Sequence, residues 1–204
     1  MWYKGKMVLS VASYNFLRWH KNARVVTAFL LDFILCYLLT DKAVQFAVER
    51  DTTMQIFEAF IWTFGDSNAI LLVSLLLLIL FADMPFITTA TPFYLMRTTR
   101  RVWAVGQLVY VALATMLFMV FTLFSTVVLT MQNAFTGNRW SRTAAALAYS
   151  GSGKELNLPS AVKDMEMSRP WQSMVRVLAL MLFNTRGKVL VMVLFHIGQG
   201  RIGG

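Results

Sequence analysis

The sequence is poor in the residues that build disulfide frameworks, metal centres and nucleophilic active sites. Its 204 residues include a single cysteine, Cys36, and two histidines, His20 and His196, near opposite ends of the chain. One cysteine cannot form an intramolecular disulfide, and two distant histidines do not have the spacing of a metal-binding motif. No serine stands in the Gly-x-Ser-x-Gly pattern of hydrolases. These absences predict that the chain is not an enzyme and holds no metal or other cofactor.

A nucleotide-binding loop is also missing, although Gly153-Lys154 ends a stretch rich in glycine and serine. The phosphate-binding loop pattern requires glycine where Ala148 stands, and serine or threonine where Glu155 stands. We therefore expect residues 150–154 to form a flexible loop without a nucleotide.

Charged residues are scarce, whereas apolar residues dominate. Hydrophobic residues make up 57% of the chain and charged residues 14%, and the mean hydropathy is +0.59. Soluble domains typically have about 25% charged residues. Long apolar runs occupy residues 25–39, 69–86 and 102–131, and the last run contains no charged residue. Because a helix needs about 20 apolar residues to cross the hydrocarbon core, the sequence predicts an all-α, polytopic membrane protein.

The runs place three spans, at about residues 25–40, 69–86 and 102–131, in a single membrane domain covering residues 1–204. As a helix the third run would be about 45 Å long, which exceeds a hydrocarbon core of about 30 Å. We therefore expect this span to tilt, to kink or to project into water at one end.

Residues 171–197 form an ambiguous fourth span. Arg186 and Lys188 separate its two apolar halves, and each would cost about 2.5–3.5 kcal/mol in the middle of the bilayer. Two interpretations stay open: a half-span followed by a re-entrant piece, or a chain that stops early. The side of the membrane on which the C-terminus lies is not assigned.

The distribution of basic residues predicts the orientation. The net charge is +9, and the basic residues cluster beside the apolar runs, which favours contact with anionic lipids over nucleic acid. Residues 1–24 form a basic arm without an acid, and the connector at residues 87–101 carries three arginines. The loop at residues 41–66 has more acids than bases. The positive-inside rule therefore predicts a multi-pass protein of the cell membrane with a cytoplasmic N-terminus, and with residues 41–66 and 132–170 outside.

Two segments outside the spans show helical spacing of apolar residues. In residues 9–20 the spacing indicates a short interfacial helix on the membrane surface, although a simple basic flank is an equal alternative. In the first loop a similar spacing indicates a second amphipathic helix at the outer interface. The residues that define the two faces are Leu9, Ala12, Phe16 and Trp19 in the first, and Phe57, Phe60, Ile61 and Phe64 in the second.

Asp32 lies near the middle of the first predicted span. A carboxylate inside the membrane is costly, and such residues are candidates for functional sites. Asp32 is therefore a candidate intramembrane polar site. The competing interpretation is a side chain that faces a polar interior contact, or one that is protonated and merely tolerated.

The connector between the second and third spans is a candidate docking element for a partner. Pro85 and Pro92 interrupt the helix, and Thr91 before Pro92 fits the start of a new one. The docking candidates combine an apolar surface with positive charge: Pro92, Phe93, Leu95, Met96, Arg97, Arg100 and Arg101. The alternative is an ordinary positive-inside loop.

The order of segments and the string TPFYLMRTTRRVWAVGQ resemble the permease subunits of export-type ABC transporters. In that family a short cytoplasmic helix between the second and third spans contacts the ATP-binding subunit, and Gly-Lys opens the next span where this chain has Gly106-Gln107. The family usually has six spans. The resemblance implies the membrane subunit of an ATP-driven exporter without ATPase activity, partnered by an ATP-binding cassette subunit and forming an oligomer with itself or with a second permease. The alternative function is a non-transporting membrane scaffold or accessory protein.

Overall fold

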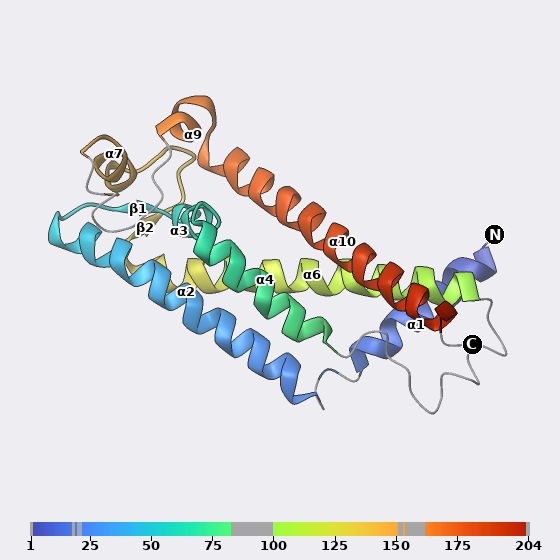
Figure 1. Ribbon diagram of the computed structural model, residues 1–204. Coiled ribbons are helices and arrows are strands. Elements are labelled where there is room, and N and C mark those ends of the chain that lie inside the picture. The colour runs from blue at the N-terminus through green and yellow to red at the C-terminus, as the bar shows by residue number, and fades with distance from the viewer. Residues whose placement is uncertain are drawn as a thin grey trace. The chain divides into compact units, whose positions relative to one another are not determined.

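The chain is all-α and mostly helical in a computed structural model, which describes residues 2–17, 19, 22–82, 100–150, 153 and 162–202 (Figure 1). Its helices are α1 (Trp2–Leu17), α2 (Ala23–Glu49), α3 (Glu58–Thr63), α4 (Ser67–Phe81), α6 (Arg100–Thr130), α7 (Arg142–Tyr149), α9 (Val162–Met167) and α10 (Pro170–Ile202). A 3₁₀ turn, Met131–Asn133, and two short strands, β1 (Met54–Gln55) and β2 (Ala134–Phe135), complete the described elements.

Local sequence explains where several helices begin. Asp66 accepts hydrogen bonds from the backbone N–H groups of Asn68 and Ala69, at the start of α4. The hydroxyl of Ser141 accepts a hydrogen bond from the Ala144 N–H and so caps α7. Pro170 occupies the first position of α10, where its missing N–H costs nothing.

The chain divides into two compact units. The first contains Met1–Ala28, Leu77–Leu117 and Met181–Gly204, and the second contains Phe29–Leu76 and Phe118–Leu180. Helices α2, α4, α6 and α10 each contribute residues to both units. The two units are described separately below.

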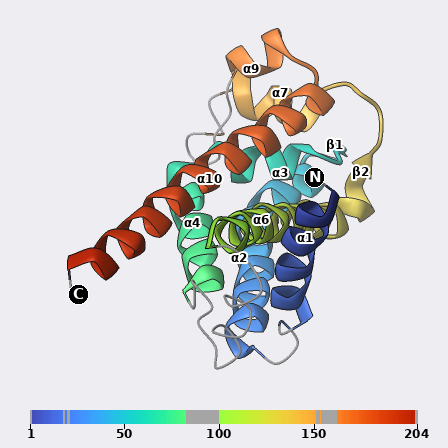
Figure 2. The ribbon, with the colours of Figure 1, turned by 90° about the vertical axis from the view of Figure 1, so that its right-hand side faces the viewer.

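The second unit repeats one order of elements. A long helix, a short strand, a short helix and another long helix follow one another as α2, β1, α3 and α4. The same order returns as α6, β2, α7 and α10, with α9 inserted. Strands β1 and β2 pair in parallel, with Met54 opposite Ala134, and they lie beside α3 in two perpendicular views (Figure 2). The repeat is one of element order among the described residues, with the 3₁₀ turn Met131–Asn133 also inserted in the second copy, and the sequence shows no corresponding repeat.

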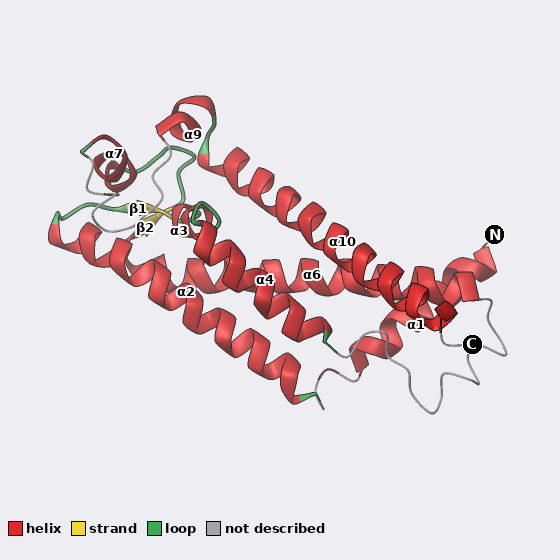
Figure 3. Cartoon of the chain, in the orientation of Figure 1, coloured by secondary structure: helices red, strands yellow, loops and turns green. Residues whose placement is uncertain are grey.

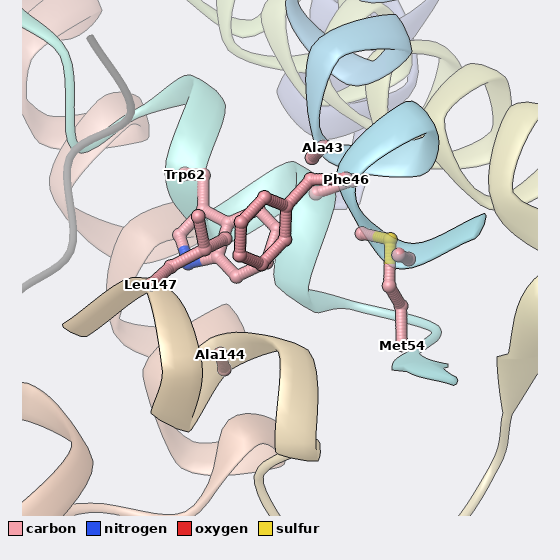
Figure 4. Close-up of a cluster of buried hydrophobic side chains, with 8 residues drawn as sticks. Ala43, Phe46, Met54, Trp62, Ala144 and Leu147 are labelled. Carbon is pink, nitrogen blue, oxygen red and sulfur yellow. The ribbon is translucent and has the colours of Figure 1, made fainter. Parts of the chain in front are cut away.

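The strand pair is short and belongs to a small cap of the second unit (Figure 3). The cap is made of β1, β2, α3 and α7 together with the end of α2. Asp51, which follows α2, has a φ of 50° and reverses the chain toward β1. Side chains from four of these elements form a buried apolar cluster, in which Phe46, Trp62 and Leu147 point toward one another (Figure 4). The cluster consists of Ala43, Phe46, Ala47, Met54, Ala59, Trp62, Ala144 and Leu147.

In the first unit α1 packs against the beginning of α6. Gly106 permits the close approach, because a Cβ there would lie 2.9 Å from the Cβ of Val11. The side-chain amide of Asn15 donates a hydrogen bond of 3.0 Å to the amide oxygen of Gln107. Trp19 donates a hydrogen bond of 2.8 Å to the hydroxyl of Tyr110. We call these contacts the α1–α6 latch.

Two of the predicted spans coincide with long helices. Helix α6 matches the predicted span at residues 102–131 closely. Helix α2 covers the first predicted span but continues to Glu49, so the expected loop start at residue 41 is wrong. No helix breaker follows Thr40, and the Gln45 amide donates a hydrogen bond of 2.8 Å to Asp41 within the continuing helix.

The remaining predicted segments differ more from expectation. Helix α4 ends at Phe81 with 15 residues, which is shorter than a typical span. Helix α10 continues through Arg186 and Lys188 as one helix, so the alternative of a half-span followed by a re-entrant piece is not found. Among the described residues, two helical segments are long and apolar enough to cross a membrane, Ala23–Glu49 and Val105–Asn133.

Candidate functional site

The buried face of α2 in the second unit is made of small and polar residues. Asp32, Cys36, Thr40, Ala43 and Ala47 recur every three or four positions, and each is at most 2% exposed. Such spacing places them on one face of the helix. Between residues 30 and 40 the exposed residues are all large and apolar: Leu30, Leu31, Phe33, Ile34, Tyr37 and Leu38. Beyond Thr40 the exposed residues include Lys42 and Gln45.

Helix α6 has the same arrangement in the second unit. Its buried residues include the hydroxyl-bearing side chains Thr122, Ser125, Thr126 and Thr130, whereas Val120, Phe124 and Val128 are exposed. A water-soluble helix normally buries its large apolar residues and exposes its polar ones. Residues 30–40 of α2 and 120–130 of α6 therefore have a burial pattern opposite to that of a helix facing water, whereas Phe46, Phe118 and Met119 lie outside these stretches and are buried.

Asp32 joins the two buried faces. The Thr122 hydroxyl donates a hydrogen bond of 2.9 Å to Oδ2 of Asp32, and the same hydroxyl lies 3.0 Å from the Phe118 carbonyl oxygen. One proton is thus shared between two acceptors. The Cys36 thiol lies 4.0 Å from the Thr122 carbonyl oxygen. The ring of Phe29, one turn before Asp32, packs on Phe118 and Phe121 of α6.

Several polar atoms on these faces have no hydrogen-bond partner in the described part of the chain: Oδ1 of Asp32, and the hydroxyls of Thr40 and Ser125. The hydroxyls of Thr126 and Thr130 donate to backbone carbonyls of α6. We call this set the polar seam: Asp32, Cys36 and Thr40 of α2, and Thr122, Ser125, Thr126 and Thr130 of α6. It contains one acidic group and no histidine, and the described residues include no group of three metal-binding side chains.

Glu58 forms a second buried polar site, in the cap of the second unit. It has no exposed surface. Its Oε1 accepts a hydrogen bond of 2.7 Å from the Ser141 N–H, and its Oε2 accepts bonds from the Ser141 hydroxyl and the Gln55 N–H. Burial raises the pKa of Glu58 above its ordinary value, and the hydrogen bonds from Ser141 and Gln55 partly oppose this rise. Sequence reasoning missed this residue because Glu58 was indistinguishable from the other acids of its loop.

A surface cleft of about 450 Å³ lies beside the start of α10 in the second unit. The Trp140 indole N–H donates a hydrogen bond of 2.7 Å to the Ser168 carbonyl at this cleft. Charged side chains of both signs line it, among them Arg139, Glu166 and Arg169. It contains no residue of the polar seam.

The docking candidates of the connector fall largely outside the described residues. Pro92, Phe93, Leu95, Met96 and Arg97 belong to residues 83–99, which the structure does not describe. Arg100 and Arg101 form the start of α6. The end of the string that carries the family resemblance is described, since Gly106 and Gln107 are the α6 residues to which α1 docks.

The comparisons with known proteins add no identity to this geometry. No protein-family model and no curated protein matches the chain, and no solved structure matches it.

Proposed function

We propose that this chain is a multi-pass membrane protein with a cytoplasmic N-terminus, and that it serves as the permease subunit of an ATP-driven exporter. The observation that carries the first part is the reversed burial of α2 and α6. Only 28% of the apolar window of α2 and 44% of that of Val105–Asn133 is buried. The core helix of a soluble protein would be mostly buried.

The energetics of the exposed side chains support the membrane. Fully burying a Leu or Phe side chain gains about 1.5–3 kcal/mol, and Leu30 and Phe33, which are 56% and 41% exposed, would forfeit part of this free energy in water. Facing lipid tails, the same side chains carry no such penalty, and helices then associate through small residues and interhelical hydrogen bonds. Ala43, Ala47 and the hydrogen bond between Asp32 and Thr122 fit that mode of packing.

The α1–α6 latch supports the exporter layout. Helix α6 begins where the connector ends, and α1 is fastened to its first turns by Asn15, Trp19 and the close contact at Gly106. A partner that displaced the connector would therefore act on α6 and α1 together. In this proposal the partner is an ATP-binding cassette subunit. It contacts Phe93 and Leu95 of the connector, and the arginines of the connector orient it.

The remaining parts of the proposal follow from charge and from the span count. The basic arm contacts anionic lipids of the cytoplasmic leaflet. Helices α4 and α10 supply the second and fourth membrane crossings in chain order, and an oligomer with itself or with a second permease completes the transporter.

The experiment is co-purification with an ATPase encoded beside this chain. Replacing both Phe93 and Leu95 by alanine should abolish capture of the ATPase and its stimulation, while membrane insertion stays normal. The matched control replaces Leu9 and Leu17, which are exposed apolar residues of α1, and it should leave capture unchanged. If the variant with alanine at both Phe93 and Leu95 still captured the ATPase normally, the result would favour the scaffold function over the exporter function.

A further inference from the structure

The polar seam contains a carboxylate whose environment is incomplete. Asp32 has no exposed surface. Its Oδ2 accepts one hydrogen bond, from Thr122, and its Oδ1 has no partner among the described residues. An ionised carboxylate accepts several hydrogen bonds when it is buried, and an isolated buried charge is very costly. A single shared hydroxyl does not satisfy this requirement.

We propose that Asp32 is a proton-binding site, and that the seam holds it as the neutral acid while α2 and α6 are packed together. The step is the reversible association of one proton with a carboxylate oxygen of Asp32. The inference rests on the proposed location of α2 and α6 in the membrane but not on the proposed export function. A failure to capture the ATPase would therefore not contradict it.

Larger occupants fit this geometry less well than a proton. A metal cation bound by hard ligands takes six or more oxygens, whereas the described hydrogen bond to the Asp32 side chain comes from the Thr122 hydroxyl. Helix α2 and helix α6 are continuous here, so their carbonyls are engaged within the helices.

The neighbouring groups do not supply a counter-charge. On α2 the buried residue one turn after Asp32 is Cys36, whose thiol cannot supply a positive charge. On α6 the facing residues are Phe118 and Thr122, which do not titrate. With no described cation beside it, the carboxyl group keeps its proton until water reaches it.

Further hydroxyls lie on the buried face of α6 beyond Thr122. Thr126 and Thr130 continue the buried face from Thr122 toward Met131, which is 69% exposed. Residues four apart on a helix are about 6 Å apart along its axis, which is longer than a hydrogen bond. The buried hydroxyls therefore do not form a continuous hydrogen-bonded chain from Asp32 to this end of the seam.

The test uses the full chain in lipid nanodiscs at neutral pH. A hydrophobic carbodiimide, which adds to protonated carboxyl groups in apolar surroundings, should modify Asp32, as peptide mass spectrometry would locate. The infrared spectrum should contain the carbonyl stretch of a carboxylic acid that disappears in Asp32→Asn. Glu58→Gln is the matched control, because it removes the other fully buried acid and should leave the Asp32 band in place.

Thr122→Val keeps Asp32 and removes its donor, and it should shift the Asp32 band without abolishing it. This variant keeps the test decisive if Asp32→Asn inserts poorly. Absence of both the modification and the acid band in the parent protein would show that Asp32 is ionised and would overturn the proposal.

Discussion

Glu58 and Ser141 are joined by two hydrogen bonds: the Ser141 N–H donates to Oε1 at 2.7 Å and its hydroxyl approaches Oε2 at 2.6 Å. Glu58 is the first residue of α3, and Ser141 is the N-cap of α7. One carboxylate thus connects the short helices of the two structural repeats in the second unit. Because Ser141 also caps α7 through Ala144, the connection fixes the helix start as well.

We expect Glu58→Ala to destabilise the cap by about 2–3 kcal/mol, since hydrogen bonds to charged or buried groups contribute about 1.5–3 kcal/mol. Glu58→Gln should cost less, because its amide oxygen still accepts from Ser141. Amide hydrogen exchange of peptides covering residues 138–149 measures the change. Glu49→Ala, at an exposed position, is the control. Equal exchange in the parent and in Glu58→Ala would show that the cap does not depend on this carboxylate.

The same residue predicts how the cap responds to pH. Burial raises the pKa of Glu58 in the folded cap above its ordinary value of 4.5. Glu58 therefore binds its proton more tightly in the folded cap than in the unfolded chain. Protonation of Glu58 stabilises the fold, and this stabilisation is complete below the pKa that Glu58 has in the unfolded chain. This contribution is lost as the pH rises through the folded pKa. Exchange at residues 138–149 should accelerate over that range, after correction for intrinsic rates, and Glu58→Gln should flatten the dependence.

Gly106 is expected to tolerate no larger side chain. A Cβ at this position would lie 2.9 Å from both Cβ and Cγ1 of Val11. Overpacking costs about 1–3 kcal/mol, which exceeds the roughly 1 kcal/mol that alanine gains over glycine inside a helix. Gly106→Ala should therefore expose α1 to proteolysis. Gly5→Ala is the matched control, because nothing lies within 4 Å of its added Cβ. Equal protease resistance in the two variants would contradict the close packing.

The amides of Asn15 and Gln107 should behave as a coupled pair. They are 6% and 4% exposed and bonded to each other at 3.0 Å. Changing either one to leucine leaves a buried amide without its partner, at a cost of about 1–3 kcal/mol. Changing both should restore much of the lost stability. A double-mutant cycle of unfolding free energies in detergent measures the coupling, and simple additivity would mean that the hydrogen bond contributes nothing.

The sequence predicted the parts of the fold that depend on long apolar runs. The span at residues 102–131 and helix α6 agree closely because an uncharged run of this length has no competing structure. The end of α2 was misplaced at residue 41, since charged residues were taken to end the helix. Charge alone does not break a helix, and Asp41 and Gln45 are even bonded within it.

The candidate site was predicted only in part, for a physical reason. Asp32 was identified because one acid inside an apolar run is conspicuous. Its partner Thr122 was not, because threonines are common in spans and pairing depends on the register of two helices ninety residues apart. Glu58 was missed for the same reason, since its partner Ser141 is distant in sequence. The connector candidates stay predictions.

The orientation in the membrane is the remaining prediction, and single cysteines test it. Cys36 is the only cysteine of the sequence, so Cys36→Ala gives a background without other thiols. In this background we expect an impermeant thiol reagent to label Glu49→Cys in intact cells and to label Thr98→Cys only after permeabilisation. The reason is that Glu49, exposed at the end of α2, follows the first span, whereas Thr98 lies in the arginine-rich connector. Labelling of Thr98→Cys but not Glu49→Cys in intact cells would reverse the orientation. Labelling of both in intact cells would contradict a membrane crossing between them.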